Sequence, residues 1–116
     1  MTTVDFFQDN YAPVREELTA RDLEVSGTIP EELDGRLLRI GPNPVLDPSP
    51  TDHWFTGSGM AHGLRLRGGE AQWYRNRYVN GDTVADALGR PRMPGPRHMD
   101  GDGGANTNII GHAGKT

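Results

Sequence analysis

The clearest alternation of apolar and polar positions in the chain lies in residues 59–67. Leu64 and Leu66 fall on one face there, and Arg65 and Arg67 fall on the other. A period of two is typical of a strand. These two arginines, together with Arg75 and Arg77 farther along the chain, are therefore interpreted first as a solvated strand face.

The residues around this segment predict a β-hairpin and further strands. The Gly-Gly pair at 68–69 is a strong two-residue turn signal, and the aromatic-rich residues 70–79 form the returning strand. Residues 23–27, 36–40 and 106–112 each read as another strand. The Gly-Pro-Asn-Pro sequence at 41–44 is expected to be a rigid structural turn.

Little helix is expected. Residues 1–22 read as an irregular leader, with one turn of helix over 14–18. Residues 28–31 resemble a capping box and predict a very short helix that ends at Asp34-Gly35. Residues 80–104 are rich in glycine and proline and predict a long loop. The fold class is therefore all-β.

Composition bounds the size and the class of the protein. The chain has 116 residues, a hydrophobic fraction of 34%, 16 glycines and 9 prolines, so we expect many turns and a core too small to fold stably alone. The net charge of −4 comes without a basic run, which argues against a nucleic-acid partner. There is no cysteine, no apolar leader typical of secretion and no apolar run long enough to cross a bilayer.

The chemically active side chains show no strong local motif. The four histidines are His53, His62, His98 and His112, and no two have the His-x-x-x-His spacing of ligands on one helix. Ser58 lacks the Gly-x-Ser-x-Gly elbow of a hydrolase, and no phosphate-binding Gly-x-x-x-x-Gly-Lys sequence occurs. Each histidine is therefore interpreted first as a hydrogen-bonded or exposed side chain.

An aromatic segment, His53-Trp54-Phe55, precedes the glycine-rich sequence Gly57-Ser58-Gly59. Glycines let backbone approach another backbone or a ligand closely. The rings therefore either line an apolar tunnel or fill a core, and the sequence leaves both alternatives open.

The order of these motifs resembles the N-terminal region of the carotenoid cleavage oxygenases, in the retinal pigment epithelial membrane protein and lignostilbene dioxygenase superfamily. The resemblance begins near residue 10 and runs to the end of the chain. The segments that carry it are Ile29-Pro30-Glu31-Glu32-Leu33-Asp34-Gly35, Gly41-Pro42-Asn43-Pro44, His53-Trp54-Phe55 and Ala105-Asn106-Thr107-Asn108 through Lys115.

This resemblance implies a seven-bladed β-propeller, with Fe(II) held by four histidines and O₂-dependent cleavage of a conjugated carbon–carbon double bond. Neutral imidazoles suit Fe(II). Seven blades need about 300 residues, so residues 1–116 would be the N-terminal part of one propeller domain, comprising the first blade region and closing strands. The family's iron ligands lie beyond residue 116, so no histidine of this chain is assigned to the metal and the chain alone is expected to be inactive.

Two substrate-binding positions carry over from the resemblance. Phe55 matches an aromatic near the substrate tunnel, and Lys115 matches a lysine that binds a substrate phenol in the stilbene-cleaving branch. That branch also uses a tyrosine from the loop before Ala105, and residues 80–104 contain none. The family's Gly-Asp-Gly-Met turn reads Gly57-Ser58-Gly59-Met60 here, which leaves a polar role of this turn open.

The leading hypothesis is the N-terminal part of an Fe(II)-dependent dioxygenase that cleaves a carotenoid or apocarotenoid to carbonyl products. The expected partners are an apolar polyene, O₂, the remaining blades of the same protein and the surface of a membrane from which substrate is extracted, and the expected location is the cytoplasm. The alternatives are a stilbene-cleaving dioxygenase of the same family and a non-catalytic β-sheet module that binds an apolar ligand or a partner.

Overall fold

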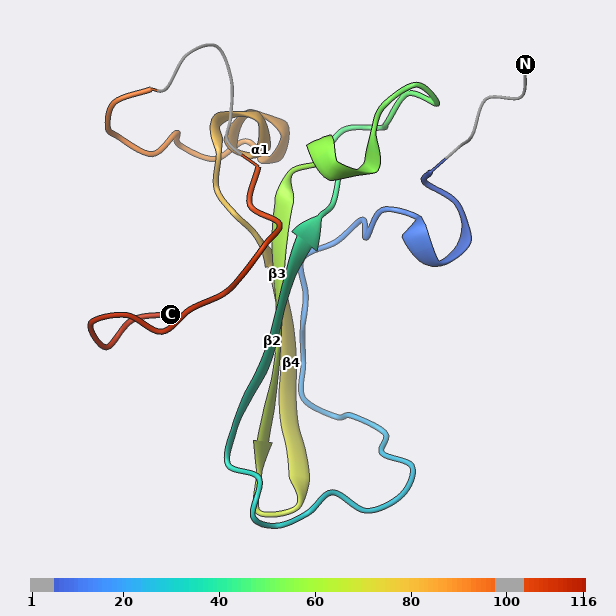
Figure 1. Cartoon of the computed structure of the whole chain (residues 1–116), viewed down its shortest axis with the longest axis vertical. Coiled ribbons are helices and arrows are strands. Elements are labelled where there is room, and N and C mark those ends of the chain that lie inside the picture. The colour runs from blue at the N-terminus through green and yellow to red at the C-terminus, as the bar shows by residue number, and fades with distance from the viewer. Residues whose placement is uncertain (1–5, 98–103) are drawn as a thin grey trace.

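A four-stranded antiparallel sheet forms the centre of the computed structural model, which describes residues 6–97 and 104–116 (Figure 1). The strands are β1 (Thr19–Ala20), β2 (Gly35–Pro42), β3 (Gly59–Arg67) and β4 (Glu70–Tyr78), in the spatial order β1-β4-β3-β2. Two 3₁₀ helices, η1 (Asp9–Tyr11) and η2 (Trp54–Thr56), and the helix α1 (Asp82–Leu88) complete the described part. The predicted β class is confirmed.

The hairpin of β3 and β4 follows the sequence closely. The strands predicted at 36–40, 59–67 and 70–79 are β2, β3 and β4. Gly68 and Gly69 connect β3 to β4 at φ 58° and 78°, values that glycine adopts without steric cost. In the register, Leu64 lies opposite Leu37 on one side and Tyr74 on the other.

The small core lies at one end of this sheet. Met60, Tyr78 and Val84 are buried together, and Val45 packs against them. The same end carries α1, η2 and the N-terminal segment, whereas the hairpin turn and residues 23–34 lie at the other end (Figure 1). Many large apolar side chains stay exposed, including Leu37 at 66% and Ile110 at 69%, so the described residues cover their apolar surface only in part.

Two predictions for the first part of the chain are wrong. Residues 14–18 have no helical turn, and residues 23–27 are not a strand. The strand of the leader is β1 instead, where Thr19 pairs with Arg75 and Ala20 with Tyr74. The reason is tertiary, because hydrogen bonds from β4 hold this stretch beside the sheet.

Two further local predictions also fail. No helix forms at 28–34, and residues 30–33 make only a turn, closed by the hydrogen bond from Leu33 N–H to the Pro30 carbonyl at 3.2 Å. Helix nucleation is costly, and β2 begins before a second turn could form. Residues 106–112 contain no extended strand, and only a single bridge joins His112 to Lys115.

The long loop predicted over 80–104 contains a helix. α1 begins after Gly81 and ends at Gly89, whose φ of 66° is typical of a helix C-terminus. Val84 and Ala85 are buried, so packing against the end of the sheet stabilises this short helix. Residues 80–104 were predicted as a loop because they are rich in glycine and proline, although the run between Gly81 and Gly89 favours a helix.

Asn43 of the Gly-Pro-Asn-Pro turn is the central buried polar group. Its Oδ1 accepts from Val14 N–H at 2.7 Å, and its Nδ2 donates to the Val14 carbonyl at 2.9 Å and to the Tyr78 hydroxyl at 2.8 Å. Only 6% of Asn43 is exposed. The turn is structural, as predicted, because one side chain satisfies the leader's backbone and the core tyrosine together.

Asn76 of β4 holds the leader in the same way. Its Oδ1 accepts from Leu18 N–H at 2.6 Å, and its Nδ2 donates to the Glu16 carbonyl at 3.0 Å. Glu17 lies between them and accepts from Tyr78 N–H at 2.8 Å while pairing with Arg90. The Arg90 hydrogen bond is the main reason that the pKa of Glu17 is lowered. The leader is therefore pinned along β4 rather than free.

Replacing Asn43 by alanine is expected to lower the free energy of unfolding of the intact protein by about 3 kcal/mol, since it removes three side-chain hydrogen bonds and leaves Val14 N–H without its acceptor. Tyr78→Phe removes the hydroxyl that bonds Asn43 and the Val14 carbonyl, but these two groups still bond each other, so the cost should be about 1 kcal/mol. Urea denaturation checks both values. Asn10→Ala, at an exposed position, is the control, and equal effects of N43A and N10A would contradict the central role of Asn43.

Candidate functional site

Phe55 lies in η2, a single turn fixed by side chains of its own segment. His53 Nδ1 accepts from Phe55 N–H at 3.1 Å, and Thr56 Oγ1 donates to the His53 carbonyl at 2.7 Å. Gly57 then packs on the Gly-Pro-Asn-Pro turn, because an added Cβ there would lie 3.0 Å from the Asn43 nitrogen. The buried turn thus positions η2 at the end of the sheet.

The aromatic rings around Phe55 form a chain of contacts that remains open to solvent. The Phe55 ring centroid lies 5.2 Å from that of His53 and 5.3 Å from that of Trp54. Beyond them, Phe6 contacts His53 and Tyr11 contacts Trp54 edge-on, each at 5.6 Å. Phe55 is 61% exposed. In the described residues its ring therefore fills no core, and it is available to an apolar ligand or to further protein.

The C-terminal segment reaches this turn through its first residues. Asn106 Nδ2 donates to the Phe55 carbonyl at 3.2 Å. An added Cβ on Gly59 would lie 2.6 Å from the Ala105 carbonyl oxygen, so the two backbones are in close contact. The sequence missed this role of Asn106, although it lies in a segment that carries the family resemblance.

Lys115, the second predicted substrate-binding residue, lies farther along the same segment. Its backbone exchanges hydrogen bonds with His112 at 2.8 and 2.9 Å, in a turn that contains Gly114 at φ 76°. Lys115 is exposed. The contacts that bring this segment to Phe55 involve Ala105 and Asn106, and they do not include Lys115.

The described histidines do not form a metal centre. No group of three or more His, Asp or Glu side chains that could hold a metal ion occurs in residues 6–97 and 104–116. His53 bonds Phe55, His112 is exposed, and His98 lies outside the described residues. The side chains present therefore do not fit a four-histidine iron site.

His62 on β3 is held by Tyr74 on β4. The His62 Nδ1 lies 2.6 Å from the Tyr74 hydroxyl. Burial disfavours the charged imidazole and lowers the pKa of His62, and the positive charge of Arg39 on β2 lowers it further. His62 is thus kept neutral as a structural hydrogen-bonding group.

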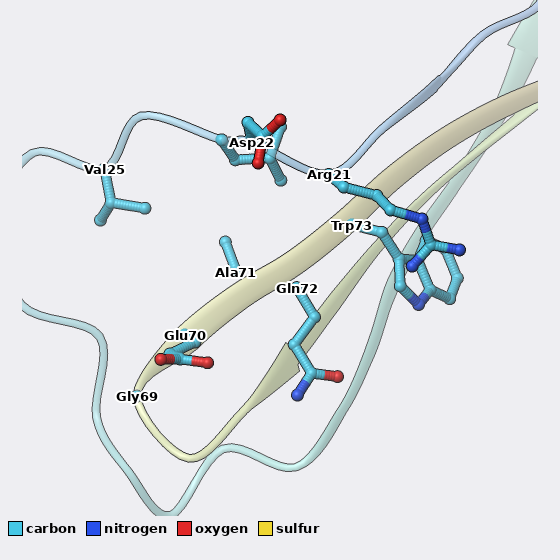
Figure 2. Close-up of a pocket in the computed structure, with 9 residues that line it drawn as sticks. Arg21, Asp22, Val25, Gly69, Glu70, Ala71, Gln72 and Trp73 are labelled. Atoms are coloured by element: carbon cyan, nitrogen blue, oxygen red, sulfur yellow. The ribbon is translucent and has the colours of Figure 1, made fainter.

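Hollows on the sheet differ in the chemistry of their walls. One is apolar, with a volume of about 620 Å³, and lies between the β2-β3-β4 face and the C-terminal segment. Its apolar lining residues include Leu38, Ile40, Ala61, Val79, Ile109 and Ile110. Figure 2 shows another, near the hairpin turn, where Arg21, Asp22 and Glu70 line a polar wall. An apolar ligand suits the first hollow and not the second.

One aromatic side chain of β4, Trp73, also lines the hollow in Figure 2. The Arg75 guanidinium lies 5.4 Å from the Trp73 ring centroid, within the range of a cation–π contact. Arg75 and Arg77 also donate to the Thr19 hydroxyl at 3.2 and 3.0 Å. These arginines of β4 therefore help to fasten β1, beyond simply covering a solvated face.

Residues 11–116 match the model of the family described as retinal pigment epithelial membrane protein. The chain belongs to this family. It is 56% identical over 108 residues to a carotenoid cleavage oxygenase of Mycobacterium tuberculosis, covering 90% of the chain and 22% of the relative. It is 45% identical over 75 residues to carotenoid 9,10(9',10')-cleavage dioxygenase 1 of Arabidopsis thaliana, covering 64% of the chain and 14% of that protein.

Solved structures agree with this membership. A lignostilbene dioxygenase of Pseudomonas brassicacearum aligns with a TM-score of 0.58 and 31% identity, over 69% of this chain and 17% of the other. An apocarotenoid oxygenase of Synechocystis aligns with a TM-score of 0.58 and 26% identity, over 81% of this chain and 20% of the other. The sheet is thus a portion of a propeller-type oxygenase fold, and the chain spans about a fifth of the length of the first relatives.

In the described residues of this family member, no helix is long and apolar enough to cross a membrane.

His62 makes the stability of the intact protein depend on pH. Its folded-state pKa lies below the ordinary value of 6.5, so the unfolded state binds a proton more readily. This contribution to stability is fully present above about pH 6.5 and is lost as pH falls toward the folded-state pKa. His62→Gln should therefore flatten the decline of the urea midpoint below pH 6.5, whereas Asn10→Ala, at an exposed position without a titratable group, should not. Parallel curves for wild type and H62Q would contradict the assignment.

Proposed function

We propose that this chain is part of an oxygenase that uses Fe(II) and O₂ to cleave a conjugated carbon–carbon double bond of a carotenoid or apocarotenoid. The observation that carries the proposal is the family match over residues 11–116, supported by the identity of 56% to the mycobacterial carotenoid cleavage oxygenase. In the reaction the double bond breaks, and each of its carbons receives one oxygen atom of O₂, which gives two carbonyl products.

The chain's own part in this reaction is to bind and orient the substrate. The described histidines do not fit the iron, so we place its ligands in the part of the protein beyond this chain. Iron would supply the activation of O₂ there. Phe55 presents an exposed ring on a backbone held by hydrogen bonds, and such a ring suits the flat apolar surface of a polyene. We also place the protein in the cytoplasm, in peripheral contact with the membrane that stores its substrate.

A stilbene-cleaving activity is the second candidate. The alignment with the lignostilbene dioxygenase of Pseudomonas brassicacearum supports it, and so does Lys115, which would donate a hydrogen bond to a substrate phenol. The absence of tyrosine from residues 80–104 favours the carotenoid. Under the stilbene alternative, Lys115→Met would raise KM for a hydroxystilbene and leave KM for an apocarotenal unchanged.

The experiment that separates these functions uses the purified intact protein. Its iron content is measured by mass spectrometry, and an apocarotenal and a hydroxystilbene are each supplied with O₂ while the carbonyl products are separated by chromatography. Cleavage of the apocarotenal with one iron per protein is expected. Cleavage of the hydroxystilbene alone would favour the second candidate, and a protein without iron or turnover would favour a non-catalytic binding module.

Phe55→Ala is expected to lower kcat/KM of the intact protein for the apocarotenal by about tenfold, equivalent to about 1.4 kcal/mol of lost binding, since the ring's apolar contact is removed. Leu46→Ala is the control, because Leu46 is 59% exposed and Phe55 61%. Steady-state kinetics measure both variants. Equal kcat/KM for F55A and wild type would remove Phe55 from the substrate site.

A further inference from the structure

The backbone of Phe55 is held from both sides by side chains. His53 Nδ1 accepts its N–H at 3.1 Å, and Asn106 Nδ2 donates to its carbonyl at 3.2 Å. His53 is a neighbour in the same turn, whereas Asn106 belongs to the C-terminal segment. Asn106 thus makes the long-range contact that relates η2 to that segment.

The position and orientation of Asn106 are themselves fixed. Thr107 Oγ1 donates to Asn106 Oδ1 at 3.3 Å, which identifies the oxygen of the amide and directs its NH₂ group to Phe55. The preceding residue, Ala105, lies so close to Gly59 that an added Cβ would meet its carbonyl at 2.6 Å. A close backbone contact therefore anchors the segment at the start of β3.

These polar contacts hold the backbone that carries the Phe55 ring, because burial does not fix this turn. η2 has three residues and none of them is buried. The ring contacts only the rings of His53 and Trp54 among the aromatic contacts of the described residues, and 61% of Phe55 is exposed. A rotation of this short turn would redirect the ring without the cost of opening a packed core.

We propose that Asn106 is a positioning residue, which holds η2 so that the Phe55 ring faces the bound polyene in the orientation needed for cleavage. The proposal rests on the proposed function for its substrate, while the contact between Asn106 and Phe55 stands on the structure. Asn106 acts through Phe55 and does not itself touch the reacting bond.

The test compares three variants of the intact protein: Asn106→Asp, Asn106→Gln and Asn108→Asp. The first keeps the size of Asn106 but removes the NH₂ donor, and the second keeps the donor on a longer chain. The third adds the same charge at an exposed position of the same segment. Kinetics with the apocarotenal are measured alongside the urea midpoint. The ¹⁹F resonance of 4-fluorophenylalanine at position 55 is recorded without substrate.

We expect N106D to lower kcat/KM about tenfold, as for loss of the ring itself, with its urea midpoint equal to that of N108D. Its ¹⁹F resonance should shift or split, because the turn samples more than one orientation. N106Q should recover part of the activity and the single resonance, and N108D should match wild type.

Matching kinetics and ¹⁹F spectra for N106D and N108D would overturn the positioning role. A fall in the urea midpoint of N106D that accounts for its loss of activity, with an unchanged ¹⁹F resonance, would overturn it as well. If the wild-type protein cleaves neither substrate, the proposed function fails, and the ¹⁹F spectra alone still decide whether Asn106 orients Phe55.

Discussion

The structure depends on the pairing of the leader's backbone by two buried asparagines. A peptide group taken out of water without a partner costs more than one hydrogen bond contributes. Asn43 satisfies both the N–H and the carbonyl of Val14, and Asn76 does the same for Leu18 N–H and the Glu16 carbonyl. An amide suits this task because it offers an acceptor and donors in one plane. The leader can therefore lie against β4 with only two residues in a strand.

The same constraint positions the aromatic turn. Asn43 is fixed by Val14 and Tyr78, its own N–H donates to the Ser58 carbonyl at 2.6 Å, and Gly57 packs directly on its backbone. η2 therefore ends beside a buried polar centre, although none of its own residues is buried. The exposed Phe55 ring can therefore have a defined place at the end of the sheet, because the hydrogen bonds of Asn43 hold the turn that carries it.

How much of the fold can be predicted depends on how far apart in the sequence the contacting residues lie. The β3-β4 hairpin could be predicted because the apolar–polar alternation and the Gly-Gly turn are local signals. β1 is not, because its position is set by Asn76, which lies 58 residues from its partner Leu18. α1 had local signals in the run from Asp82 to Leu88, but the surrounding glycines and prolines outweighed them.

The same distinction holds at the candidate site. Phe55 was selected because the family resemblance distinguishes it within the aromatic run 53–55, whereas its partner Asn106 lies 51 residues away and its amide carries no signal of its own. Lys115 was also selected by resemblance. Its backbone forms a turn with His112, and this turn does not involve Phe55. Sequence motifs and family resemblance thus identify candidate residues, whereas only the fold identifies the residues that position them.

Several polar side chains of this chain hold neighbouring groups in position, as their hydrogen-bond partners show. His53 and His62 each form a hydrogen bond to a neighbouring residue through a ring nitrogen. The side-chain amides of Asn43, Asn76 and Asn106 each form hydrogen bonds to backbone groups. Such hydrogen bonds hold geometry well. Each of these imidazoles keeps its second nitrogen, but in the described residues no group of three or more side chains converges on a metal. A protein that needs both a metal and an aligned apolar substrate can therefore separate the two tasks along its chain, with rigid placement of the apolar wall in one portion and the ligands in another.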